Sequence, residues 1–175
     1  MLSPKLEAAL NEQINAELYS AYLYFSMASY LASIDLTGCA HYMHAQTQEE
    51  LLHASKMYEY VNERGGRVIM EAIKAPKTQW GSPIEAFEDA YKHEQHVTSL
   101  INSLMELAIT EKDHATQIFL QWFISEQVEE EASANGVVQR MKLASSSPGG
   151  LFMIDKELAA RPLTFVLAAN KTQGA

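Results

Sequence analysis

The chain has 175 residues, 47% of them apolar and 20% charged, with a formal charge of −9. This length fits one domain with a substantial core, and the composition is that of an ordinary globular protein. The negative charge argues against binding nucleic acid or an anionic membrane, and no apolar run approaches the roughly 18 residues of a membrane span. Because Cys39 is the only cysteine, an intrachain disulfide and a four-cysteine iron site are excluded. The first residues show no secretory signal, so we expect a cytoplasmic protein.

Apolar periodicity and capping signals predict five helices. Ser3 can cap the first helix, with Pro4 in its first turn, and Ser82 and Pro83 repeat this pattern at the third. Asp113 is the expected cap of the fourth helix. The expected ranges are about residues 4–33, 39–64, 82–110, 113–145 and 151–160.

The connections predict the topology. Residues 35–38 and 111–113 are short turns, so the helices that they join should form antiparallel pairs. Residues 67–81 can extend about 50 Å, whereas a 27-residue helix is about 40 Å long. This segment can therefore cross the whole bundle. We predict an all-α four-helix bundle with one long crossover and a short fifth C-terminal helix. The apolar residues of the crossover should pack along the bundle: Val68, Ile69, Met70, Ile73 and Trp80.

Each long helix carries a glutamate near its middle, inside an otherwise apolar stripe. These residues are Glu17, Glu50, Glu94 and Glu130. Burying an unpaired carboxylate is costly, and protonation relieves that cost only in part. Two divalent cations would balance four carboxylates, so the pattern predicts a paired metal site. A glutamate at the edge of a stripe often faces solvent, but that interpretation does not suit one on every helix.

The two helix pairs repeat the same spacings of 33 and 36 positions. The matched sets are Glu17, Glu50 and His53 in the first pair and Glu94, Gln127 and Glu130 in the second. Residues i and i+3 share one helical face, as two ligands of one metal require. Imidazole and carboxylate ligands in this number favour iron, with manganese or zinc able to compete.

At these residues the chain resembles the ferritins, and most closely the bacterial non-haem ferritins, over about residues 3–160. The motif set is Glu17, Tyr24, Glu49-Glu50-x-x-His53, Glu94 and Glu126-Gln127-x-x-Glu130. The resemblance implies a ferroxidase that oxidises Fe(II) with dioxygen or peroxide. It also implies a hollow shell of twenty-four identical subunits that stores ferric mineral, with the fifth helix at a fourfold axis.

The same resemblance implies roles for individual residues. Glu50 would bridge two irons, with Glu17 and His53 completing one site and Glu94 and Glu130 the other. Gln127 would donate a hydrogen bond near the oxygen-binding position, and Tyr24 would lie beside the centre. Glu49, Glu126 and Glu129, with Glu130 shared, would form a third iron site. Periodicity alone favours a solvated acidic face for those first three glutamates.

The sequence also gives expectations for haem, for two aromatic residues, for four histidines and for the tail. Bacterioferritins carry a haem-ligating methionine where this chain has Leu51, and a second Glu-x-x-His where it has Gln127 and Glu130, so we expect no haem. Tyr24 and Trp122 are either electron donors or ordinary core aromatics. Four histidines are expected to be solvated: His41, His44, His93 and His96. Residues 161–175 form an apolar tail that we expect at a subunit contact or inside the shell.

Two alternative functions remain open. The first is another di-metal enzyme, such as a rubrerythrin-like peroxidase or a manganese catalase, although the missing second Glu-x-x-His and the missing cysteines disfavour it. The second is a storage subunit without oxidase activity, which would lack the ligands present here. A DNA-protecting mini-ferritin is disfavoured because the tail after Arg161 has only one basic residue, Lys171.

Overall fold

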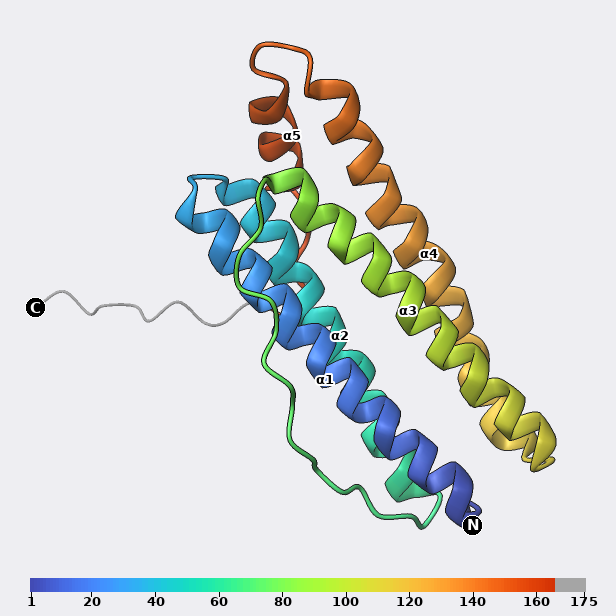
Figure 1. Cartoon of the computed structure of the whole chain (residues 1–175). Helices are drawn as coiled ribbons and strands as arrows, with labels where there is room; N and C mark the ends of the chain where they lie inside the picture. The colour runs from blue at the N-terminus through green and yellow to red at the C-terminus, as the bar shows by residue number, and fades with distance from the viewer. Residues whose placement is uncertain (166–175) are drawn as a thin grey trace, which may run out of the picture.

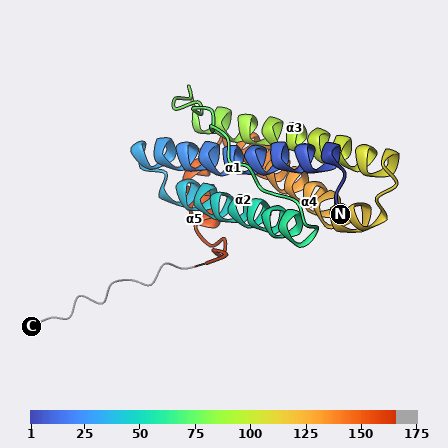
Figure 2. The same ribbon diagram turned by 90° about the horizontal axis from the view of Figure 1, so that it is seen from below.

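The computed structural model describes residues 1–165 and contains five α-helices (Figure 1). They are α1 (Pro4–Ser33), α2 (Thr37–Glu63), α3 (Pro83–Thr110), α4 (His114–Ala144) and α5 (Gly150–Leu158). No strand occurs in this part of the chain. Figures 1 and 2 show the four long helices alongside one another, with α5 next to α2 and α4. The predicted all-α bundle with a crossover and a short fifth helix is confirmed.

The predicted caps form. The hydroxyl of Ser3 accepts a hydrogen bond from the Leu6 amide at 3.3 Å, and Ser82 accepts one from Glu85 at 3.2 Å. Asp113 caps α4 in the same way. The second helix begins at Thr37, earlier than the predicted Cys39, because the turn is made by Asp35 in a left-handed conformation with φ 62°.

Gly38 in the first turn of α2 allows α5 to dock. A Cβ atom at this position would lie 1.7 Å from the backbone oxygen of Asp155 in α5. The Asp155 carboxylate accepts a hydrogen bond of 2.8 Å from the Cys39 amide, and Ile154 and Leu158 are buried. This close backbone approach fixes the C-terminal end of the described chain against α2.

The crossover between α2 and α3 runs along α1 in the same direction as that helix (Figure 1). Asn11 bonds the carbonyl of Arg67 at 3.0 Å and the amide of Ile69 at 2.7 Å, and Ser26 bonds the carbonyl of Lys77 at 2.7 Å. The segment therefore spans the bundle from one end towards the other. This leaves α2 and α3 parallel, as the connection lengths predicted.

The expectation that the apolar crossover residues all pack on the bundle is wrong for three of them. Trp80 is buried and Val68 packs partly on the core, but Ile69, Met70 and Ile73 are 56%, 61% and 40% exposed. The cause is the polar attachment to α1. The asparagine and serine side chains bind the backbone of the crossover and hold it at the surface of α1, where these three side chains stay largely exposed.

The interior consists of two apolar clusters at different levels of the bundle. One includes Met27, Met43, Phe87 and Val137, and the other includes Leu10, Met57, Ile101 and Leu120. On every long helix the mid-helix glutamate lies between residues of the first cluster and residues of the second. The fold thus encloses a layer of carboxylates between two apolar layers. No helix in residues 1–165 has both the length and the apolar character needed to cross a membrane.

Candidate metal centre

The four mid-helix glutamates converge inside the bundle, as the sequence predicted. Glu17 and Glu94 are each 1% exposed, Glu50 is 2% exposed and Glu130 is 7% exposed. Each helix contributes one of them, because the apolar stripe in which the glutamate lies faces the core. The alternative that they face solvent is excluded.

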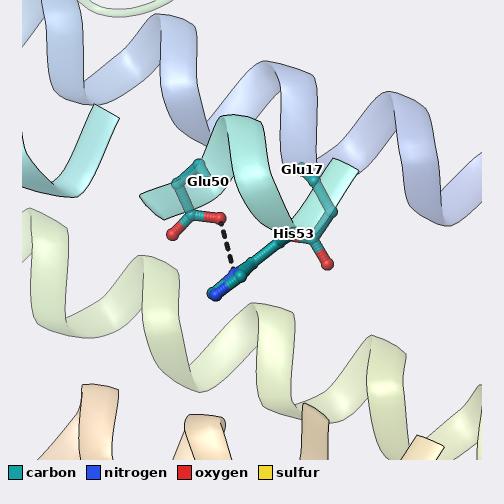
Figure 3. A group of neighbouring side chains, drawn as sticks. All are labelled: Glu17, Glu50 and His53. Atoms are coloured by element: carbon teal, nitrogen blue, oxygen red, sulfur yellow. Dashed lines mark ion pairs between the residues drawn. The ribbon is translucent and has the colours of Figure 1, made fainter. Parts of the chain in front are cut away.

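Glu17, Glu50 and His53 form the tightest group. One ligand atom from each lies within 4.8 Å of the other two, and in residues 1–165 they make the one such group of three or more histidine, cysteine or acidic side chains. Figure 3 shows Glu50 and His53 on successive turns of α2, with Glu17 reaching from α1. The Nδ1 atom of His53 is 3.5 Å from Oε2 of Glu50.

Two carboxylate oxygens in this group lack hydrogen-bond donors. Oε2 of Glu17 and Oε2 of Glu50 are buried without a partner in the described part of the chain. A buried carboxylate oxygen without a donor is costly unless a cation neutralises it. Both atoms are potential oxygen ligands next to an imidazole, and Fe(II), Mn(II) and Zn(II) all bind to ligands of these two kinds. These residues therefore fit a divalent metal ion.

Glu94 and Glu130 face the same layer, but neighbouring side chains hold their carboxylates. Tyr24 donates a hydrogen bond to Oε1 of Glu94, and Nε2 of Gln127 donates to Oε2 of Glu94 at 3.2 Å. Nε2 of Gln46 donates to Oε2 of Glu130 at 2.9 Å. The predicted positions of Tyr24 and Gln127 beside the carboxylates are thus observed, whereas a metal-binding role for Glu94 and Glu130 stays a prediction.

Sequence reasoning missed Gln13 and Gln46. Gln13 donates from Nε2 to Oε1 of Glu17 at 2.9 Å, and both amides are buried within the carboxylate layer. They are separated by the same 33 positions as Glu17 and Glu50, so the repeat carried a signal for them. These amides orient carboxylates that would otherwise be free to rotate.

Burial controls the electrostatics of the layer. It raises the pKa of Glu50 well above the ordinary value, and the charges of Glu94 and Glu17 raise it further. Burial also raises the pKa of Glu94 to about 7, with Glu130 adding to the effect and the bonds from Tyr24 and Gln127 opposing it. Without cations the layer therefore binds protons, and a divalent cation must displace them.

A second group of carboxylates borders this layer on the side of α2 and α4. Glu49, Glu126 and Glu129 line a pocket of about 380 Å³, together with His53 and Glu130 of the central group. The structure thus places the three outer glutamates around one pocket, but within residues 1–165 their carboxylates do not meet in a group as tight as that of Glu17, Glu50 and His53. It also adds a residue that sequence reasoning missed, since Nη2 of Arg161 lies 2.5 Å from Oε2 of Glu49.

The aromatic and histidine expectations have mixed outcomes. Trp122 is 36% exposed and its ring contacts His53 edge-on at 5.4 Å. His93 was expected to be solvated, and this is wrong: it is half-buried and Nε2 lies 2.8 Å from the hydroxyl of Ser20. Its burial between α1 and α3 lowers the pKa of the imidazole to about 4. His44 and His96 are exposed as expected, whereas the expectation is also wrong for His41, which is half-buried with Nε2 bonded to the carbonyl of Arg161 at 2.8 Å.

Residues 7–144 match the Ferritin family of ferritin-like domains. A bacterial non-heme ferritin of Bacteroides fragilis is 46% identical over 161 residues, which cover 92% of this chain and 100% of that protein. One of Campylobacter jejuni is 42% identical over 156 residues, covering 89% of this chain and 93% of that protein.

Solved structures of the ferritin of the archaeon Archaeoglobus fulgidus have the same fold. An engineered closed form is 52% identical with a TM-score of 0.92, covering 94% of this chain and 100% of the other. A structure described as a novel open pore ferritin is 52% identical with a TM-score of 0.91, covering 93% and 100%. With the match over residues 7–144, these similarities show that the chain belongs to the ferritin family.

Proposed function

We propose that this protein stores and detoxifies iron by oxidising Fe(II) at the carboxylate layer and holding the ferric product inside a shell of identical subunits. The observation that carries the proposal is the pair of buried oxygens, Oε2 of Glu17 and Oε2 of Glu50, that lack donors beside His53. Membership of the ferritin family supports iron as the metal.

Two Fe(II) ions are the substrates. Glu17, Glu50 and His53 would hold one of them, and Glu94 and Glu130 would hold the other with Glu50 between them. Each ion gives up one electron, so a pair supplies the two electrons that reduce dioxygen to hydrogen peroxide, or peroxide to water. Anionic oxygen ligands favour the higher charge of Fe(III) and so help the oxidation.

The surrounding side chains position the carboxylates for this reaction. Gln13, Gln46 and Gln127 fix their orientation through the hydrogen bonds described above, and Tyr24 restrains Glu94. Protons that leave Glu50 and Glu94 when cations bind are available to the reduced oxygen. Glu49, Glu126 and Glu129, with Glu130 shared, would form the third iron site next to this centre.

The shell is the second part of the proposal. The relatives are named as ferritins, and one is described as an open pore ferritin, which supports a hollow assembly. We propose that the assembly has twenty-four subunits and that it binds no haem. Electron microscopy of the purified protein tests this. Closed shells support the proposal, whereas open dimers would favour a peroxidase-like or catalase-like di-metal enzyme.

A matched pair of variants on α1 tests the oxidation. Glu17→Gln keeps the size of a buried side chain but removes its charge, whereas Glu12→Gln makes the same change at an exposed position. We expect stopped-flow oxidation of Fe(II) by dioxygen to slow roughly tenfold or more in the first variant and to stay unchanged in the second. Equal rates in both variants would reject the assignment. If the wild-type protein binds Fe(II) without oxidising it rapidly, a storage subunit without oxidase activity is favoured.

A further inference from the structure

We propose that Arg161 is a tethered cation that competes with metal ions for Glu49 and so controls loading of the pocket beside the metal centre. The inference rests on the proposed function, because it concerns how cations reach the outer glutamates. The ion pair between Arg161 and Glu49, which are 112 positions apart, joins the segment after α5 to α2.

Arg161 occupies an otherwise acidic pocket. Glu49, Glu126, Glu129 and Glu130 line it, and Arg161 supplies the one lysine or arginine side chain among its lining residues in the described chain. A guanidinium stays charged at every physiological pH, so loss of a proton cannot release it. Another cation can release it, by taking the carboxylates in its place.

The arginine is held in position from several sides. Its guanidinium lies 4.3 Å from the centre of the Tyr42 ring, and Nε2 of His41 donates to its carbonyl at 2.8 Å. Farther along, the Phe165 amide donates to the Gln48 side chain at 2.9 Å. These partners all belong to α2, so the chain after α5 is attached along the rim of the pocket.

The ion pair is also one that a divalent cation can replace. Only one arm of the guanidinium reaches Glu49, and Nη1 is buried without a hydrogen-bond partner in residues 1–165. The side chains of Arg161 and Glu49 are still 18% and 27% exposed, so solvent weakens their attraction. A divalent ion that contacts several carboxylates at once has twice the charge and more ligands. Metal loading of this pocket should therefore displace Arg161.

The test is calorimetric titration of the metal-free assembly with Zn(II) in Arg161→Gln and in a matched control, Arg140→Gln. Arg140 also pairs with a carboxylate, Glu157 of α5 at 3.1 Å, but it lies outside the pocket. We expect Arg161→Gln to raise the affinity for the Zn(II) ions that bind after the paired site is full by roughly threefold to tenfold. Arg140→Gln should leave this affinity unchanged. In protein that already carries Glu49→Gln, the further change Arg161→Gln should leave the affinity for Zn(II) unchanged.

A measurement on the unmodified protein complements the variants and does not depend on their folding. Phenylglyoxal should modify Arg161 several-fold faster once more Zn(II) has been added than the paired site can bind. The rate at which it modifies Arg140 in the same sample should stay the same. Unchanged zinc affinity in Arg161→Gln, an equal change in Arg140→Gln, or constant phenylglyoxal reactivity would overturn the inference. Wild-type protein that shows no tight paired site would instead reject the proposed function.

Discussion

The hydroxyl of Tyr24 on α1 donates a hydrogen bond to the carboxylate of Glu94 on α3 inside the carboxylate layer. Burial and the nearby acidic groups raise the pKa of the phenol well above its ordinary value, so it remains a donor at neutral pH. The bond therefore joins the two helix pairs at the level of the metal centre. It also lowers the pKa of Glu94 against the opposing effect of burial.

Replacing Tyr24 by phenylalanine should weaken metal binding in a pH-dependent way. Without the donor, the pKa of Glu94 rises above about 7, so more of this carboxyl is protonated at neutral pH and a cation must displace the proton. We expect Zn(II) affinity to fall about tenfold at pH 7 and the difference from wild type to narrow as pH rises. Calorimetry at several pH values measures this.

Tyr19→Phe is the control for that variant. The rings of Tyr19 and Tyr24 both contact the ring of His93, but Tyr24 is the one that donates to Glu94. The same loss of affinity in both variants would show that the effect is not specific to the bond with Glu94. A loss that stays constant with pH would show that it does not act through protonation.

The stability of the metal-free protein should depend on the charge of Glu94. Its folded-state pKa of about 7 lies above the ordinary 4.5, so the folded chain binds more protons than the unfolded chain between these pH values. The free energy of unfolding therefore falls as pH rises through this window, by an amount on the order of 3 kcal/mol for this group. Comparing Glu94→Gln with wild type isolates the effect.

That comparison is necessary because His93 acts in the opposite direction. Its pKa of about 4 lies below the ordinary 6.5, so it adds stability as pH rises over nearly the same range. We expect the melting temperature of Glu94→Gln to exceed that of wild type increasingly from pH 4.5 to above 7, at equal subunit concentration. Saturation of wild type with Zn(II) should remove the advantage, and a constant difference across pH would contradict the assignment.

Gly38→Ala should detach α5. The new methyl carbon would meet the backbone oxygen of Asp155 at 1.7 Å, and neither backbone can move without breaking the packing of α5 on α2. We expect a lower melting temperature and faster reaction of the buried Cys39 with a thiol reagent. Gly136→Ala is the matched control, since nothing lies within 4 Å of its Cβ position in α4. That change should be neutral or stabilise the protein by about 1 kcal/mol.

Helical periodicity was sufficient to predict the positions of the central glutamates. An apolar stripe with a carboxylate near its middle recurs on every long helix, and a bundle has one interior in which those stripes can meet. The caps at Ser3, Ser82 and Asp113 are local signals that need no tertiary information, so the helix boundaries they set were also predictable.

Contacts between distant segments were not predictable from the same patterns. Gln46 precedes Glu50 by four positions, yet its amide bonds Glu130 on another helix, a choice that only the packed structure determines. Arg161 reaches Glu49 across 112 positions, and no local pattern links them. The exposure of Ile69 and Met70 was not predictable, because apolar character alone does not reveal that Asn11 binds the backbone beside them.

The expected position of the tail concerns mostly residues that lie outside the described part of the chain. For residues 161–165, the contacts of Arg161 with Glu49 and of Phe165 with Gln48 place the start of this segment on α2. Its relation to neighbouring subunits stays a prediction, as does the division of the chain into a ferritin-like domain of residues 1–160 and a tail of residues 161–175.

Anomalous diffraction from crystals soaked anaerobically with Fe(II) would locate the bound iron ions and identify their ligands. We expect a pair of iron peaks inside the bundle, one bounded by Glu17, Glu50 and His53 and the other by Glu94 and Glu130. A third, weaker peak is expected near Glu49, Glu126 and Glu129, with Arg161 turned away from it. Iron peaks confined to the protein surface, with none in the carboxylate layer, would show that these glutamates do not form a metal centre.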